Sequence, residues 1–201
     1  KLEKRLYIMR ICVYGAASPT IDPKYIELVE QMGKEMASRG HSLVFGGGGN
    51  GLMGAAARGV KNGGGYILGV IPKFFDEENV EAICDFCDEL IQPDTMRQRK
   101  QLMEDNADAF IIVPGGIGTF EEFFEILTLK QLCRHNKPIA LYNLMGYYDD
   151  INYAMEQAMN KNFIRDNCKE LYYMTDNLED LLRYIESPVD KIRTVKELKD
   201  G

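Results

Sequence analysis

The stretch AFIIVPGGIGTFEE (residues 109–122) joins an apolar run to a helix-like run through three closely spaced glycines. The apolar part is typical of a strand that is buried on both faces of a parallel sheet. Large apolar residues then recur at the spacing of a core-facing helix, namely Phe120, Phe123, Phe124 and Leu127. The stretch therefore predicts a strand, a glycine turn and a helix.

The rest of the chain repeats this alternation, which is typical of βαβ units and of a parallel sheet covered by helices on both faces. The predicted strands are 6–15, 42–46, 66–71, 88–92, 109–115, 138–143 and 171–175. The predicted helices are 23–39, 52–62, 95–106, 119–134, 147–160 and 177–186. No repeat or Pro/Ser-rich linker interrupts the pattern, so residues 1–201 are expected to form one domain whose polar tail, 190–201, frays.

Composition limits the classes of function. The 201 residues are 45% hydrophobic, enough for a substantial core, and the net charge of -7 argues against a protein that binds the nucleic-acid backbone. The apolar stretch near the amino end is short and broken by charges, so we expect neither a signal sequence nor a membrane span. We expect a cytoplasmic protein with no nucleic-acid or membrane partner.

Five scattered cysteines favour reduced thiols over a disulfide framework. Cys84 and Cys87 form one C-x-x-C, but a zinc site needs further ligands, and His41 and His135 are the only histidines left to complete it. Ordinary thiols are the favoured interpretation, with no metal.

Because ligands of open parallel sheets bind beyond the carboxyl ends of strands, the turns that follow strands matter most. In YGAASP (14–19), Ser18 offers a hydroxyl, although a tight turn ended by Pro19 fits equally well. FGGGGNGLMG (45–54) matches G-x-G-x-x-G, but the next strand ends without the acidic residue of a dinucleotide site. Two interpretations remain for this loop: an anion site at a helix N-terminus, or a close contact between helix and sheet.

The turn at residues 114–119 also allows two interpretations, a helix cap or a phosphate-binding loop. Thr119 and Glu122 are spaced as a capping box, with Thr119 as the predicted N-cap. A capping box does not require three glycines, however. Glycines at 115, 116 and 118 are expected to expose consecutive N–H groups in a nest suited to phosphate oxygens.

The segment PDTMRQRKQLM (93–103) predicts a helix that begins with another capping box, Thr95 and Gln98. Arg99 falls on the apolar stripe of this helix and therefore needs a partner, for which Glu122 is the expected carboxylate. Arg97 and Lys100 either meet a phosphate or form a solvated helix face.

GGGGNGLMG (46–54), MRQRK (96–100) and PGGIGTFEE (114–122), in this order, resemble the motifs of the Lonely Guy family of cytokinin-activating phosphoribohydrolases. The likeness extends along almost the whole chain. It implies a Rossmann-like three-layer α/β sandwich with a mostly parallel sheet of about seven strands, forming one nucleotide-binding domain that works as a homodimer. It also implies hydrolysis of the N-glycosidic bond of nucleoside 5′-monophosphates, such as cytokinin ribotides and AMP, to the free base and ribose 5-phosphate.

Carried over residue by residue, the resemblance makes Arg99 and Glu122 catalytic. The substrate contacts that it implies, together with those expected from the loops, are Ser18, Gly47, Gly48, Glu81, Met96, Lys100, Gly115, Gly116, Gly118, Thr119 and Thr128. Glu77 and Glu78 fit the acidic position nearly as well as Glu81. No cofactor is expected: family members have been called lysine decarboxylases, but no lysine here stands in a recognisable pyridoxal phosphate setting.

The motifs depart from the family pattern at two places, since GAAS (15–18) replaces GSS and MRQRK replaces MHERK. Two alternative functions stay open. A carrier of a phosphorylated ligand such as molybdenum cofactor has a similar fold and PGG-x-GT turn, but would not need the pair of Arg99 and Glu122. A general purine nucleotide nucleosidase would use the same residues with a different base pocket.

Overall fold

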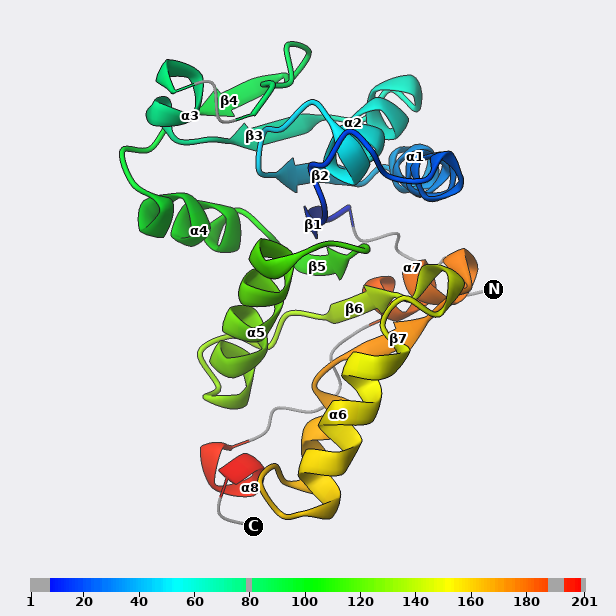
Figure 1. Cartoon of the computed structure of the whole chain (residues 1–201), viewed down its shortest axis with the longest axis vertical. Helices are drawn as coiled ribbons and strands as arrows, with labels where there is room; N and C mark the ends of the chain where they lie inside the picture. Colours follow the sequence, from blue (N-terminus) through cyan, green and yellow to red (C-terminus); the bar gives the residue numbers. More distant parts are fainter. Residues whose placement is uncertain (1–7, 79–80, 188–193, 200–201) are drawn as a thin grey trace.

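The computed structural model describes residues 8–78, 81–187 and 194–199. It contains a seven-stranded, entirely parallel sheet in the order β4-β3-β2-β1-β5-β6-β7 (Figure 1). The strands are β1 (Arg10–Tyr14), β2 (Ser42–Phe45), β3 (Ile67–Val70), β4 (Glu89–Ile91), β5 (Ala109–Ile112), β6 (Ile139–Tyr142) and β7 (Tyr173–Thr175). All seven predicted strands are thus confirmed, although each is shorter than predicted. Residues 6 and 7 of the first predicted strand lie outside the described residues.

Most helices also match the prediction. They are α1 (Pro23–Ser38), α2 (Gly51–Asn62), α3 (Lys73–Glu77), α4 (Met96–Asp105), α5 (Ile117–Gln131), α6 (Asp149–Asn160), α7 (Leu178–Glu186) and α8 (Val195–Lys199). Two 3-10 helices, η1 (Leu144–Gly146) and η2 (Asp166–Glu170), complete the set. The sequence did not predict α3 or α8. The expectation of a frayed tail is wrong over α8, because Leu198 is buried in the core beside η2.

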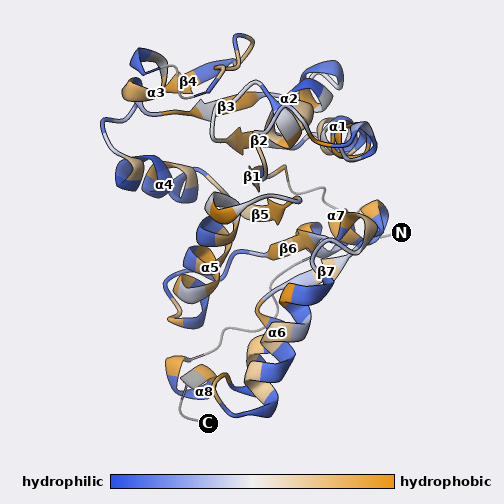
Figure 2. Ribbon diagram, in the orientation of Figure 1, coloured by the Kyte–Doolittle hydropathy of each residue, from blue (hydrophilic) through white to orange (hydrophobic). Residues whose placement is uncertain are grey.

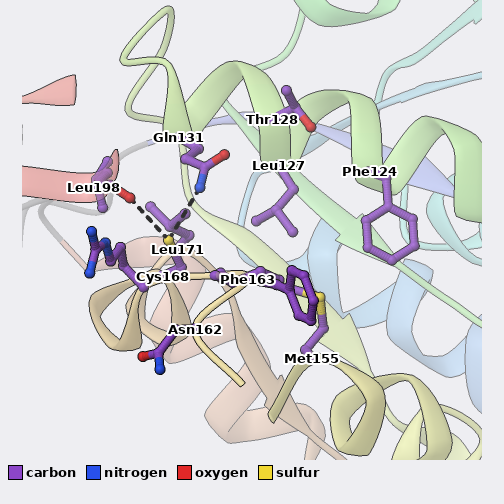
Figure 3. A pocket seen from close by; sticks show the side chains of 12 residues that line it. Phe124, Leu127, Thr128, Gln131, Met155, Asn162, Phe163, Cys168, Leu171 and Leu198 are labelled. Carbon is purple, nitrogen blue, oxygen red and sulfur yellow. Dashed lines mark hydrogen bonds between the residues drawn. The ribbon is translucent and has the colours of Figure 1, made fainter. Parts of the chain in front are cut away.

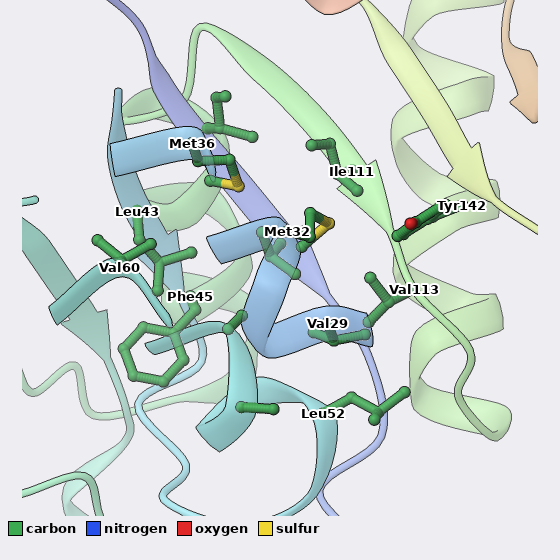
Figure 4. Packing of buried hydrophobic residues seen from close by; sticks show 14 of the residues in the cluster. Val29, Met32, Met36, Leu43, Phe45, Leu52, Val60, Ile111, Val113 and Tyr142 are labelled. Atoms are coloured by element: carbon green, nitrogen blue, oxygen red, sulfur yellow. The ribbon is translucent and has the colours of Figure 1, made fainter. Parts of the chain in front are cut away.

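Alternate residues of each strand face two separate cores. On β1, Ile11 and Val13 pack with α1, α2 and α7, whereas Cys12 and Tyr14 pack on the opposite face with α5 and α6. Figure 4 shows the first core, where Met32 and Met36 of α1 lie over the sheet. Strands and inward helix faces are hydrophobic and the outer helix faces are hydrophilic (Figure 2). This confirms the three-layer α/β sandwich.

The strand order reverses at β1, which lies between β2 and β5. Crossovers from β1 run to one side of the sheet and those from β5 to the other, so the loops after these two strands separate. Such a switch point is where open α/β sheets bind ligands. In the described part of the chain, none of the helices has the length and apolar character needed to cross a membrane.

Candidate active site

Arg99 of α4 and Glu122 of α5 meet beside this switch point, as the sequence predicts. Nη1 of Arg99 lies 3.7 Å from Oε1 of Glu122. Both side chains are buried, with Arg99 6% and Glu122 9% exposed. Because an unpaired buried charge is very costly, this contact explains how an arginine can stand on the inward face of α4.

Two backbone carbonyls fix the guanidinium of Arg99. Its Nε donates to the carbonyl oxygen of Val70 at 3.1 Å, and its Nη2 donates to that of Gly46 at 3.4 Å. The ring of Phe75 lies 5.7 Å from the guanidinium carbon. A Cβ added to Gly46 would lie 1.9 Å from Nη2, so the glycine at this position makes room for the arginine.

The environment of Glu122 sets its protonation. Burial raises the pKa of its carboxyl to about 7, and the positive charge of Arg99 opposes that rise. A carboxyl with a pKa near neutrality can serve as a general base, and in its ionised form it can stabilise a developing cation. Perturbed groups of this kind cluster at functional sites.

A second acidic side chain approaches Arg99 from the loop before β4. Burial raises the pKa of Glu81 and the charge of Arg99 lowers it. Oε1 of Glu81 is buried and has no hydrogen-bond partner among the described residues. Gly48 lies directly against it, since an added Cβ would be 1.7 Å from that oxygen. Glu77 and Glu78, the other acidic candidates, are exposed.

The helix α5 begins at Ile117 with Gly116 as its N-cap, so the prediction that Thr119 caps this helix is wrong. Gly116 has extended backbone dihedrals (φ -97°, ψ -152°) and ends the turn three residues before Thr119. Thr119 is instead buried within the first helical turn. A Cβ added to Gly115 would lie 2.1 Å from its Oγ1, which explains the glycine there.

The start of α5 is open. A Cβ added to Gly116 or to Gly118 would meet no atom within 4 Å, and Ile117 between them is 88% exposed. The backbone N–H groups of residues 117–119 donate to no acceptor among the described residues. Free N–H groups and the helix dipole make such an N-terminus a site for an anion.

The glycine loop before α2 is closed by comparison. The N–H groups of Leu52 and Met53 both donate to the carbonyl oxygen of Ala16, at 2.8 and 3.4 Å. Gly51 has a φ of +59°, and an added Cβ would lie 2.5 Å from that same oxygen. The geometry at this helix start therefore favours the close-contact interpretation of the loop. Gly47, like Gly48, is buried, and a Cβ added to Gly47 would lie 2.9 Å from Cβ of Ile71.

The remaining predicted contacts lie further out. Ser18 is exposed and its hydroxyl is 3.1 Å from that of Thr20. Met96 is 39% exposed at the start of α4. The ammonium of Lys100 is held by two carboxylates of α5. Thr128 is exposed and lines a separate hollow of about 520 Å³ between α5, α6 and η2 (Figure 3).

The C-x-x-C thiols stand beside this site rather than in it. A hydrogen bond from Cys87 lowers the pKa of Cys84 to about 7, against the effect of burial. The N–H of Cys84 donates to the carbonyl oxygen of Gly47 at 2.8 Å, which ties the two loops together. Among the residues described, three or more His, Cys, Asp or Glu side chains do not gather as a metal site would require.

Comparisons with known proteins show the family to which the chain belongs. Residues 53–185 match the family model described as "Possible lysine decarboxylase". Cytokinin riboside 5′-monophosphate phosphoribohydrolase LOG2 of Arabidopsis thaliana is 35% identical over 189 residues, covering 94% of this chain and 88% of the relative. The cytokinin riboside 5′-monophosphate phosphoribohydrolase of Mycobacterium tuberculosis is 39% identical over 173 residues, covering 86% of this chain and 91% of the relative. The chain belongs to the Lonely Guy family.

Solved structures show how widely the Lonely Guy fold is shared. A molybdenum cofactor binding protein from Rippkaea orientalis has a TM-score of 0.66 at 21% identity, covering 89% of this chain and 96% of its own. The molybdenum cofactor carrier protein of Chlamydomonas reinhardtii has a TM-score of 0.63 at 20% identity, covering 88% and 94%. At these identities the likeness establishes the Rossmann-like fold alone.

Two tyrosines to which the sequence analysis gave no role support the turn before α5. Tyr147 donates its hydroxyl to the carbonyl oxygen of Gly115 at 2.6 Å, and Tyr148 donates to that of Val113 at 2.7 Å. They hold the turn that carries the family's PGG motif. The signal for them was the tyrosine pair that closely follows the strand 138–143 in the sequence.

Proposed function

We propose that this protein hydrolyses the N-glycosidic bond of nucleoside 5′-monophosphates, giving the free base and ribose 5-phosphate. The observation that carries the proposal is the buried ion pair of Arg99 and Glu122 beside the open N-terminus of α5. The carboxylate of the ion pair suits a cationic transition state, and the free N–H groups at the start of α5 suit a phosphate. The names of the curated relatives, which are phosphoribohydrolases, support the same reaction class.

The chemistry assigns a task to each part. As the base departs, the ribosyl carbon becomes oxocarbenium-like, and the Glu122 carboxylate stabilises this cation and orients or deprotonates the incoming water. Arg99, fixed by two carbonyls, keeps Glu122 ionised and in place. The N–H groups from Gly116 to Thr119 anchor the 5′-phosphate, so that binding energy remote from the reacting bond orients the sugar.

The other predicted contacts complete the proposed site. Glu81, with its unpartnered oxygen, faces the sugar from the loop before β4, above Gly48. Ser18 and Met96 border the site from neighbouring elements, and we propose that Thr128 reaches nucleotide across a subunit boundary. A carrier of a phosphorylated ligand would have no use for the buried ion pair.

Base release is the test. Purified protein is incubated with AMP and with isopentenyladenosine 5′-monophosphate, and the free base is followed by chromatography, with both nucleosides as phosphate-free controls. Release from the monophosphates alone is the expected result. The ratio of the two rates separates a cytokinin-activating enzyme from a general purine nucleotide nucleosidase. Binding without release from either monophosphate would favour the carrier.

The role of Glu122 has its own test. Glu122→Gln keeps the size of the side chain but cannot carry the negative charge, so we expect monophosphate binding to persist while turnover is lost by at least about a thousandfold. Binding is measured by calorimetry and turnover by base release. If Glu122→Gln turns over within tenfold of the wild type, the catalytic role of Glu122 is refuted.

We further propose a homodimer that forms through the hollow in Figure 3. Phe163 is 84% exposed beside it and Phe124 is 40% exposed. Exposed aromatic side chains around a hollow are typical of a surface that a partner covers. Light scattering should give twice the mass of the chain for the wild type and the mass of a single chain for Phe163→Asp; a monomeric wild type would contradict the proposal. A cytoplasmic location stays a proposal that rests on the sequence argument.

A further inference from the structure

Cys84 and Cys87 lie on the segment 81–88, which leads into β4 at one edge of the sheet (Figure 1). Both thiols are reduced, and residues 85 and 86 form a turn between them. The thiols hydrogen-bond to each other and pack against the same hydrophobic core. A turn of this length holds its end residues within about 7 Å between Cα atoms, a separation at which a disulfide can close.

The surroundings of the pair favour a thiolate. The hydrogen bond from Cys87 and another from the backbone N–H of Phe86 lower the pKa of the Cys84 thiol to about 7, although burial opposes them. The hydrogen bond between the thiols raises the pKa of Cys87, so the pair shares one proton. Cys84 is 4% exposed, whereas Cys87 is half-buried, so a reagent reaches Cys87 first. A partly ionised and partly exposed thiol pair is the reactive kind of cysteine.

The segment that ends at Cys84 pairs with the glycine loop of the active site. Two backbone hydrogen bonds, of 2.7 and 2.8 Å, and one β-bridge join residues 82–84 to residues 47–49. Cys84 donates the second of these hydrogen bonds to the carbonyl oxygen of Gly47. Glu81 lies directly before the paired segment, with its carboxylate against the same loop. A displacement of Cys84 is therefore passed on to Glu81.

Cys87 is the more firmly held of the two cysteines. Its Sγ lies against β3, where a Cβ added to Gly69 would be 3.0 Å from the sulfur. The next residue, Asp88, bonds twice to Ile67 of β3: its N–H donates at 3.0 Å and its carboxylate accepts at 2.9 Å. A disulfide brings its two sulfur atoms to about 2.0 Å. Cys84 is therefore the residue that moves when the bond closes.

We propose that Cys84 and Cys87 are a redox modification site, and that the disulfide between them withdraws Glu81 from the substrate. The disulfide stands on the geometry of the turn alone, whereas its effect on the substrate rests on the proposed function. Because hydrolysis of an N-glycosidic bond involves no oxidation, the pair controls that reaction and takes no part in it.

The oxidant is a low-molecular-weight disulfide such as glutathione disulfide. Cys87 gives its proton to Cys84 and attacks one sulfur of glutathione disulfide, whose S–S bond breaks and releases one glutathione thiolate. That thiolate takes the proton from Cys84, which then attacks the Sγ of Cys87 and releases the second glutathione. Two protein thiols are oxidised to one disulfide, and one glutathione disulfide is reduced to two molecules of glutathione.

Peptide mass spectrometry tests the modification. The protein is equilibrated in glutathione buffers of increasing disulfide fraction, quenched with acid and alkylated. The peptide that contains both cysteines should lose two hydrogen atoms and retain no glutathione while reduced glutathione is still in excess. The control Cys133→Ser, which removes an exposed cysteine elsewhere, should behave in the same way. If the pair stays reduced under these conditions, or retains bound glutathione instead, the modification site is refuted.

Base release from AMP tests the effect on the site. Oxidation should raise KM about tenfold, close to the cost of one hydrogen bond to a charged group, and dithiothreitol should restore it. Cys87→Ser should keep the KM of the reduced wild type in either buffer. Glu81→Gln should have a raised KM that oxidation changes no further. A KM that is unchanged on oxidation of the wild type, or that rises again in oxidised Glu81→Gln, would refute the route through Glu81.

Failure of the proposed function is recognised separately, as a reduced wild type that releases no base. Mass spectrometry still decides whether the disulfide forms. Hydrogen exchange of the Gly49 amide, which donates to the carbonyl oxygen of Ala82, then reports on the loop without turnover. A changed exchange rate on oxidation of the wild type, but not of Cys87→Ser, would uphold the coupling, and equal rates would refute it.

Discussion

One methyl group at Gly46 should disable the site while leaving the fold intact. Gly46 does not have a left-handed φ, so alanine is compatible with the backbone. The added Cβ would, however, stand 1.9 Å from Nη2 of Arg99, a separation that real side chains essentially never show. Because the obstructing atom is the far end of a flexible side chain, the guanidinium should move rather than the backbone.

The size of the effect follows from the geometry. To reach 3.0 Å, the shortest separation that real Cβ atoms show, Nη2 must withdraw by about 1.1 Å. If that motion lengthens the 3.7 Å contact with Glu122 to about 4.8 Å, the attraction at an effective dielectric of ~20 falls from about 4.5 to about 3.5 kcal/mol. A loss of ~1 kcal/mol raises the pKa of Glu122 by about 0.7. Misplacement by ~1 Å also costs turnover on the order of a hundredfold.

The assay is base release from AMP as a function of pH, with the melting temperature measured in parallel. For Gly46→Ala we expect turnover to fall about a hundredfold and the acidic limb to rise by about 0.7 unit, with Tm within about 4 °C of the wild type. The matched control is Gly49→Ala in the same loop, whose added Cβ would meet its nearest atoms at 3.4 Å and should leave activity within about twofold. Full activity in Gly46→Ala would refute the claim that this glycine positions the arginine.

Three further predictions concern stability. Gly51 has a φ of +59°, and the Cβ of Gly51→Ala would lie 2.5 Å from the carbonyl oxygen of Ala16. This variant should therefore lower the free energy of unfolding, measured by urea titration, by about 2 kcal/mol or more. A loss under about 0.5 kcal/mol would contradict the prediction. Tyr148→Phe removes the buried 2.7 Å hydrogen bond to Val113 and should cost about 1–3 kcal/mol, and an unchanged midpoint would show that water replaces it. Because the folded pKa of Glu122 is raised to about 7, wild-type stability should fall by up to about 3 kcal/mol as pH rises from about 4.5 to 7. Glu122→Gln should lack this component, and identical pH slopes in the two proteins would contradict the shift.

The sheet was predictable because its strands are read from local sequence. Continuous apolar runs such as AFII in β5 identify strands buried on both faces, and alternation with amphipathic runs predicts the parallel order. The short helices α3 and α8 were not predicted, because local sequence does not identify a helix this short. Each has five residues, too few for a helical period, and Leu198 of α8 is buried by tertiary contacts that local sequence does not reveal.

Some features of the site were also predictable from the sequence, and others were not. The pair of Arg99 and Glu122 was predictable because a charge on an apolar helical stripe demands a partner. The cap of α5 was not, since Gly116 and Thr119 both fit a helix start and the choice depends on how Gly115 packs against Thr119. The tyrosine that supports this turn, Tyr147, lies 32 residues further along the chain, and only the folded sheet brings it there.

Product analysis with AMP tests the central claim most directly. The wild type and Glu122→Gln are incubated side by side with AMP, and adenine, adenosine, phosphate and ribose 5-phosphate are all quantified. We expect the wild type to give adenine and ribose 5-phosphate in equal amounts and Glu122→Gln to give neither. Adenosine with free phosphate, or equal rates for the two proteins, would contradict cleavage of the N-glycosidic bond at this site.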